Sequence, residues 1–208
     1  MAHIPDGILS APVLIGGAAV ALGGVTLGLR SLSDRAIPRA AILSAAFFTA
    51  SLISVPVGPS SVHLLLSGLM GIMLGIAIFP AVGVALILQA LLFGFGGLTT
   101  LGVNTVNIAL PGFILAMAIG PIIRSSHSSA MRAGLSALIG ALSVLGTGGL
   151  VALSLALSAP EYTPVASVLL ATYLPLALAE AFVTAAVVGF LSRVQPDALS
   201  LATGAATS

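Results

Sequence analysis

The sequence has no cysteine and no tryptophan, and only 5% of its 208 residues are charged. The absence of cysteine excludes disulfides, thiolate metal sites, iron–sulfur clusters and cysteine nucleophiles. Soluble domains usually carry about 25% charged residues, so a surface with so few charges could not stay dispersed in water. The net charge of +1 provides no basic face, so nucleic acid is excluded as a partner. These absences point to the lipid bilayer as the natural solvent of the chain.

Long apolar runs occupy most of the chain, and 59% of all residues are hydrophobic. A bilayer core about 30 Å thick takes roughly 20 helical residues to cross. The pattern therefore predicts an all-α, polytopic membrane protein with about seven transmembrane helices. The expected spans lie near residues 9–30, 38–55, 62–79, 80–95, 105–124, 133–158 and 165–192.

The third and fourth spans form one continuous apolar run, 62–95. Pro80, directly after Phe79, is the expected turn, because proline removes a helix hydrogen bond and clashes with the preceding turn. The alternative is one very long kinked helix, which would give six spans in total.

The basic residues distinguish these two counts. All six are arginines: Arg30, Arg35, Arg39, Arg124, Arg132 and Arg193. With seven spans they fall on one side of the membrane, whereas six spans would divide them between both faces. The positive-inside rule makes the arginine side cytoplasmic. We therefore expect the N-terminus outside and the C-terminus in the cytoplasm.

The domain organisation follows from these spans. Residues 1–193 form a single helical bundle with an outer N-terminal segment, 1–8, and residues 194–208 form a small, polar and disordered cytoplasmic tail. The start of the chain has no basic region and no cleavage site, so we expect the segment to remain in the mature protein.

Small residues recur at helical spacing in two stripes, which permits close helix contacts in lipid. The stripes consist of Ser67, Gly71 and Gly75, and of Gly112, Ala116 and Gly120. Internal helix packing is one interpretation, and docking onto a partner membrane subunit is the other.

Two of the three histidines are candidates for chemistry. His127 lies in a cytoplasmic loop and is expected to be solvated. His3 and His63 are both expected at the outer face, where two imidazoles can share a metal ion. The alternative is that His63 caps a helix and His3 lies free in solvent.

The N-terminal amine adds a donor beside His3. If Met1 is removed, the donors are the Ala2 amine and the amide and imidazole nitrogens of His3, and His63 completes a set of four. If Met1 stays, its amine joins the Ala2 and His3 amides and the His3 imidazole, and His63 becomes axial or superfluous. An all-nitrogen set suits Ni(II) and Cu(II) and can take Co(II).

Other polar residues are candidates for supporting roles. Outer hydroxyl and amide groups could orient a ligating imidazole, or simply bond to loops and helix ends; these are Ser60, Ser61, Thr99, Thr100, Asn104 and Asn107. Gln89 is expected to bridge helices in lipid. Glu180, deep within a span, is a candidate for metal passage or subunit coupling; the alternative is that it is protonated or pairs with a polar partner across the bundle. Asp6 is expected to cap or turn the N-terminal segment.

Four segments resemble the CbiM/NikM family, the membrane substrate-binding subunits of energy-coupling-factor transporters for cobalt and nickel. They are HIPDGILS, GPSSVHLLLSGLMGIMLG, LQALLFGFGGLTTLGVNTVNIALPG and LPLALAEAFVT. The resemblance covers most of residues 3–190. It implies a seven-helix bundle in a bacterial cytoplasmic membrane, whose N-terminal segment enters from outside and holds the metal through His3 and His63. The family typically begins Met-His, whereas this chain begins Met-Ala-His.

The resemblance also implies a function. The chain would capture Co²⁺, or possibly Ni²⁺, as bound substrate for an ATP-driven importer that supplies cobalt for cobalamin biosynthesis, with no permanent cofactor. The chain lacks a GxxxxGK[ST] phosphate loop, so ATP hydrolysis would occur in CbiO-like subunits. A CbiQ-like coupling subunit and a small CbiN-like membrane protein complete the implied complex.

Two other functional classes fit the sequence less well. A self-contained channel or ion-coupled carrier would need a polar route across the bilayer, for which Glu180, Gln89 and a few hydroxyl groups are sparse. An intramembrane enzyme is disfavoured, since the chain has no HExxH motif, no cysteine and no evident Ser–His pair.

Overall fold

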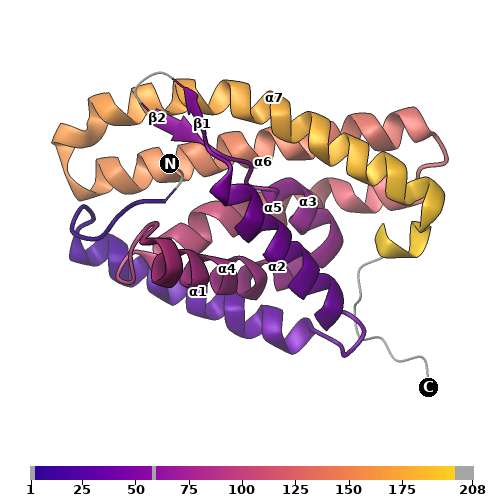
Figure 1. Ribbon diagram of the computed structural model, residues 1–208, viewed down its shortest axis with the longest axis horizontal. Coiled ribbons are helices and arrows are strands. Elements are labelled where there is room, and N and C mark those ends of the chain that lie inside the picture. Colours follow the sequence, from indigo (N-terminus) through magenta and orange to yellow (C-terminus); the bar gives the residue numbers. More distant parts are fainter. Residues whose placement is uncertain (1–2, 58–59, 200–208) are drawn as a thin grey trace.

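The computed structural model describes residues 3–57 and 60–199, which form a helical bundle with one small hairpin (Figure 1). The helices are α1 (Ala11–Ser31), α2 (Ile37–Leu52), α3 (Ser67–Leu74), α4 (Ile78–Phe93), α5 (Leu101–Ser125), α6 (Ser129–Ser158) and α7 (Thr163–Val194). Single 3-10 turns are η1 (Gly75–Ala77), η2 (Pro160–Tyr162) and η3 (Pro196–Leu199). The expected outer loop 56–61 contributes to an antiparallel hairpin, β1 (Val55–Val57) and β2 (Ser60–Val62).

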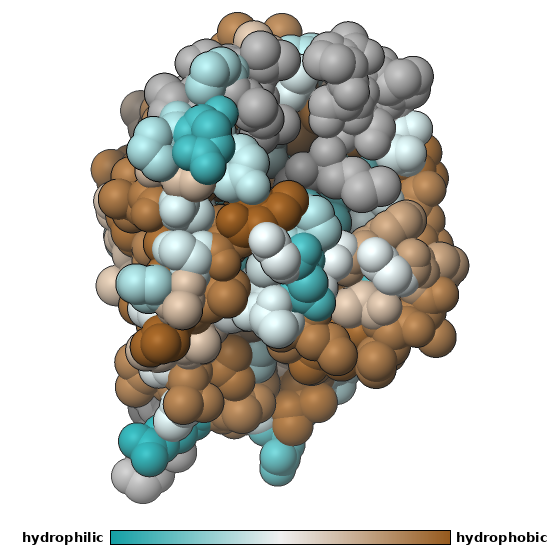
Figure 2. Space-filling view, turned by 90° about the vertical axis from the view of Figure 1, so that its left-hand side faces the viewer, coloured by the Kyte–Doolittle hydropathy of each residue, from teal (hydrophilic) through white to brown (hydrophobic). Residues whose placement is uncertain are grey.

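The fold confirms the prediction of a multi-pass, helical membrane protein. Five helical runs among the described residues are long and apolar enough to cross a bilayer, and α2 is a shorter apolar helix. Large hydrophobic side chains such as Leu22, Leu178 and Phe182 are more than two-thirds exposed. The hydrophobic residues on the face shown in Figure 2 likewise extend to the surface. Water would not solvate such a surface, and lipid would.

The apolar run Ser67–Phe93 folds back on itself. Along α3, Ser67 bonds the Ile108 carbonyl and Gly71 lies against Gly112, so α3 runs parallel to α5. Along α4, by contrast, Phe79 meets Phe113 and Gly83 approaches Thr105, so α4 runs antiparallel to α5. The chain therefore reverses between α3 and α4, although the run's 27 residues would suffice for a single span.

The reversal occurs at η1 rather than at the expected Phe79–Pro80 position. Gly75 has φ +57° and ψ −130°, a conformation that side chains disfavour. Pro80 lies in the first turn of α4, where its missing N–H is not needed for an intrahelical bond. Two helices, α3 and α4, occupy the predicted run, and the turn between them was placed a few residues too late.

The small-residue stripes pack inside the molecule. A β-carbon added to Gly71 would lie 2.2 Å from the Gly112 carbonyl oxygen, and one added to Gly112 would meet Ser67 at the same distance. The α3 and α5 backbones therefore touch, which supports the internal-packing interpretation for this part of the two stripes.

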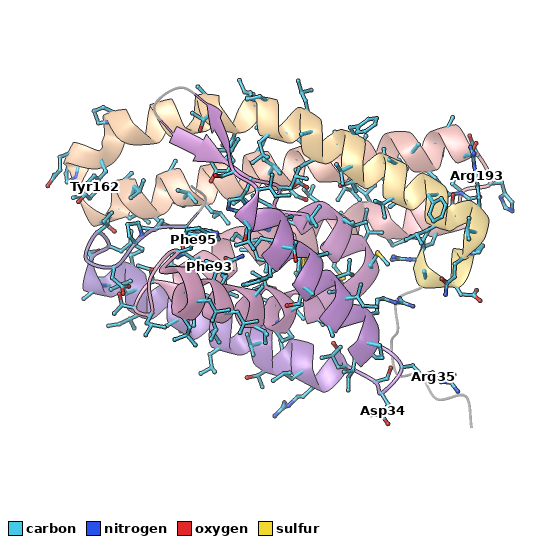
Figure 3. The ribbon with its side chains drawn as sticks, viewed as in Figure 1. Asp34, Arg35, Phe93, Phe95, Tyr162 and Arg193 are labelled. Carbon is cyan, nitrogen blue, oxygen red and sulfur yellow. The ribbon has the colours of Figure 1, made fainter. Side chains whose placement is uncertain are left out.

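The arginines gather at one end of the bundle, where α1, α5 and α7 end and α2 and α6 begin; we call it the arginine end. Figure 3 shows Arg35 and Arg193 there, with Tyr162 and Phe95 toward the other end. The C-terminal region is more ordered than predicted. α7 continues to Val194, and η3 buries Ala198 and Leu199 against the core, whereas residues 200–208 lie outside the described part.

Candidate metal centre

The N-terminal segment is tied to the beginning of α5 by a paired hydrogen bond. The Ile4 amide donates to the Asn104 Oδ1 atom at 3.0 Å, and the Asn104 side-chain amide donates to the Ile4 carbonyl at 3.0 Å. Thr100 donates its hydroxyl to the same carbonyl at 2.7 Å. Ile4 is buried beside Leu9, with Val103, Val151 and Leu155 in the same cluster. Polar and apolar contacts thus fix the backbone immediately after His3.

Asp6 makes a second attachment, to the loop before α5. Its carboxylate accepts hydrogen bonds from the backbone amides of Leu98, Thr99 and Thr100 and from the Thr99 hydroxyl. These bonds hold the pKa of the Asp6 carboxyl below its ordinary value, with the Thr99 hydroxyl as the main cause. A β-carbon at Gly97 would lie 2.0 Å from the carboxylate, so this loop has room only for glycine there.

His3 and His63 stack on each other inside the protein. Their ring centroids are 5.1 Å apart with an interplanar angle of 19°, and each residue is only 5% exposed. Gly96, with φ +77°, lies under His3, where an added β-carbon would come within 3.3 Å of the His3 Cβ atom. The turn before α5 thus leaves space for one ring of the pair.

Three ring nitrogens of this pair lack a hydrogen-bond partner among the described residues: both nitrogens of His3 and the Nε2 atom of His63. The remaining one, His63 Nδ1, lies 3.0 Å from the Leu64 carbonyl oxygen. Because a carbonyl can only accept, Nδ1 carries the proton and Nε2 keeps its lone pair. A metal ligand needs such a free lone pair.

The surroundings of the pair favour neutral imidazoles. Burial, followed by the charge of His63, lowers the pKa of His3 from 6.5 to about 3. Burial also lowers the pKa of His63, against a smaller opposing effect of its bond to Leu64. Both rings are therefore unprotonated near neutral pH, the state in which histidine binds metals.

Glu180 of α7 reaches the segment between His63 and α3. Its Oε1 atom accepts hydrogen bonds from the backbone amides of Leu65 and Leu66. The side chain is fully buried. The contact joins parts of the chain that are 114 and 115 positions apart.

The other candidate residues lie in different places. Gln89 bridges helices as expected, since its amide donates to the Ser51 hydroxyl of α2 at 2.7 Å. Asn107 is buried on α5 beside an apolar groove between α1 and α6, and no hydrogen bond joins it to the imidazoles. His127 is exposed in the loop between α5 and α6. Met1, Ala2 and the side chains of Ser60 and Ser61 lie outside the described part.

No cluster of three or more His, Asp or Glu side chains exists within residues 3–57 and 60–199 that could hold a metal by side chains alone. The imidazole pair therefore needs further donors to complete a coordination shell.

Comparison with known proteins identifies the family of the chain. Residues 3–198 match the family described as "Cobalt uptake substrate-specific transmembrane region". The chain belongs to this family. It is 34% identical to a putative metal transport protein of Haemophilus influenzae, over 95% of this chain and 97% of that protein. It is 33% identical to the cobalt transport protein CbiM of Kyrpidia tusciae, over 96% and 87%. A solved transition metal transporter superposes with a TM-score of 0.73 at 27% identity, over 92% and 93%.

Some members of the cobalt-uptake family are fused to further sequence. The fused nickel transport protein NikMN of Rhodobacter capsulatus is 33% identical over 95% of this chain, which spans 64% of that protein. The putative fused cobalt transport protein CbiMQ of Methanocorpusculum labreanum is 27% identical over 94% of this chain and 36% of that protein. The region equivalent to this chain is thus one part of a larger transport protein in these relatives.

Proposed function

We propose that this chain is the metal-capture subunit of an ATP-driven importer for divalent cobalt or nickel. The observation that carries the proposal is the buried pair of neutral, stacked imidazoles, His3 and His63, with three ring nitrogens free of hydrogen bonds among the described residues. Burying such groups without partners is costly, so the arrangement is best explained by a cation that uses them. The transport roles of the family's named members agree with this reading.

The donor set of the proposed site is nitrogen throughout. His3 supplies its imidazole and backbone amide, and His63 supplies Nε2. If Met1 is removed, the Ala2 amine completes the set. If Met1 stays, its amine and the Ala2 amide join the two His3 nitrogens, and His63 becomes axial or superfluous. Nitrogen donors suit Ni(II) and Co(II) and match Mg²⁺ and Ca²⁺ poorly. Intact-mass measurement of the N-terminal peptide identifies which amine is present.

The energy for uptake would come from other subunits. The sequence has no phosphate-binding loop, which fits a capture subunit that works with CbiO-like ATPases. The fused relatives, whose names join M to N or to Q, support CbiN-like and CbiQ-like partners. We propose that the imported cobalt serves cobalamin biosynthesis.

The proposal is tested by His3→Ala and His63→Ala, each compared with His127→Ala, a solvent-exposed control. Loss of a direct ligand should weaken Co²⁺ and Ni²⁺ binding by more than the roughly 10- to 100-fold typical of outer-shell partners. Calorimetry on purified protein and uptake of radioactive cobalt by cells measure the effect. Wild-type affinity in both site variants would refute the site, and uptake by the chain alone in liposomes would refute the need for an ATPase.

A further inference from the structure

Helix α3 begins without a cap of its own. Its N-cap residue is Leu66, whose side chain cannot accept a hydrogen bond, and no side-chain cap is formed from within the helix. The first amides of a helix lack intrahelical acceptors, so a buried helix start needs acceptors from elsewhere. This start is buried, since Leu65 is fully inaccessible and Leu66 is 7% exposed.

Leu66 also has an unusual backbone conformation. Its φ is +52°, and it is the only residue other than glycine with positive φ in the described part. Leucine rarely adopts the left-handed region, because its Cβ crowds the backbone there. Such a conformation persists only where the surrounding structure imposes it. The turn that leads from His63 into α3 is therefore held in place by something outside itself.

Glu180 supplies what this turn lacks. One carboxyl oxygen accepts from the Leu65 and Leu66 amides, the latter at 2.8 Å. The other oxygen, Oε2, has no hydrogen-bond partner among the described residues. A glutamate carboxyl group and a glutamine side-chain amide both offer an oxygen that can accept these two bonds. The contact therefore depends on the length of the side chain and does not require a negative charge.

Glycines bring the carboxyl group close enough. An added β-carbon at Gly68 of α3 would lie 2.8 Å from the Gly140 Cα atom of α6. One at Gly140 would lie 2.6 Å from the Glu180 carbonyl oxygen of α7. The α3, α6 and α7 backbones therefore converge beside Glu180, which fixes where its side chain begins relative to α3.

We propose that Glu180 is a positioning residue for the metal centre: it holds the Leu65–Leu66 turn that leads into α3 and thereby sets the place of His63, two residues before Leu65. The inference rests on the proposed function, because it gives Glu180 its effect on metal through the His63 imidazole. Glu180 does not itself touch the metal. His63 also lies beside the helix that carries Glu180, since His63 lines one pocket together with Leu176 and Ala179 of α7.

Two conservative variants separate reach from charge. Glu180→Gln keeps the length and one acceptor oxygen and removes the charge. Glu180→Asp keeps the carboxyl group but is one methylene shorter, so its oxygen withdraws from the two amides. The matched control is Gln89→Asn, which removes one methylene from another fully buried polar side chain that bridges helices.

The first measurement is the Co²⁺ and Ni²⁺ affinity of each purified full-length variant, with its thermal midpoint. We expect Glu180→Gln to bind within about threefold of wild type. We expect Glu180→Asp to bind roughly 10- to 100-fold more weakly, as outer-shell losses do. Gln89→Asn should lower the midpoint and leave the affinity unchanged. Weak binding by Glu180→Gln with normal binding by Glu180→Asp would overturn the proposal, because charge would then be the requirement.

The second measurement shows whether Glu180 acts through His63. In a His63→Ala background, Glu180→Asp should cause no further loss of affinity, because the group that it positions is gone. Equal losses in both backgrounds would overturn the proposal. Wild-type affinity in both His3→Ala and His63→Ala would instead refute the metal site itself, so the two failures are distinguishable.

A third measurement needs no metal. Hydrogen exchange of the Leu65 and Leu66 amides should be slow in the wild type and in Glu180→Gln, and faster in Glu180→Asp. Equally slow exchange in Glu180→Asp would show that the turn holds without the Glu180 contact, and the positioning role would be refuted.

Discussion

Asp6 ties the N-terminal segment to the loop before α5 through four hydrogen bonds to residues 98–100. Asp6→Ala should free the segment and lower Co²⁺ and Ni²⁺ affinity by about tenfold, in the range of other supporting residues. Asp34→Ala, an acidic residue at the arginine end (Figure 3), is the control and should bind normally. An unchanged affinity in Asp6→Ala would show that the Asn104 attachment is sufficient.

The two buried imidazoles predict how the metal-free protein responds to acid. The pKa of His3 is lower in the folded chain, about 3, than its ordinary value of 6.5, so the unfolded chain binds more protons between these values. Stability should therefore fall as the pH drops below about 6.5, and this loss should continue toward pH 3. Thermal midpoints at pH 7.5 and 5 measure the loss, and His3→Ala should show a smaller one. The same loss in His3→Ala would assign it to other groups.

The sequence allowed some of these single-residue features to be predicted and not others. His3 and His63 were singled out by donor chemistry and by expected topology, and Asp6 by its position in a turn-like HIPDG motif. The contact of Glu180 with Leu65 could not be predicted, since it joins residues 115 positions apart. Hydropathy likewise says nothing about which amides a buried carboxyl group meets.

At the scale of elements, the contact between α3 and α5 depends on glycine. A β-carbon at Gly71 would lie 2.2 Å from the Gly112 carbonyl oxygen, whereas one at Gly16 of α1 would meet nothing within 4 Å. Gly71→Ala should destabilise the fold by about 1–3 kcal/mol through overpacking. Gly16→Ala should be neutral or slightly stabilising, because alanine favours the helix. Thermal midpoints of the two variants in detergent provide the comparison, and equal midpoints would contradict the close contact.

The helices themselves follow largely from hydropathy, because lipid requires long apolar segments with internally bonded backbones. The predicted span 133–158 corresponds to α6, Ser129–Ser158, and 9–30 corresponds to α1, Ala11–Ser31. The turn within 62–95 was misplaced because the first turn of a helix tolerates a proline, so Pro80 does not end the helix. The chain instead reverses at Gly75, whose backbone conformation favours glycine. Apolar residues on both sides of Gly75 hide it from any hydropathy pattern.

At the scale of the whole molecule, the reversal at η1 decides which loops share a side of the membrane. With the reversal, Asp34 and His127 lie at the same end of the bundle and Glu161 lies at the other. Without it, α5, α6 and α7 would each cross in the opposite direction. Asp34 and Glu161 would then share a side, and His127 would lie opposite.

The absence of cysteine makes this topology directly measurable, because each introduced thiol reports alone. We expect Asp34→Cys and His127→Cys to be protected in intact cells from a maleimide that cannot cross the membrane, and to react after permeabilisation. Glu161→Cys, at an exposed position, should react in intact cells. The arginines give the physical reason, since gathering them on the cytoplasmic side obeys the positive-inside rule only if α3 and α4 run in opposite directions. Reaction of His127→Cys in intact cells, with Asp34→Cys protected, would overturn the reversal between α3 and α4.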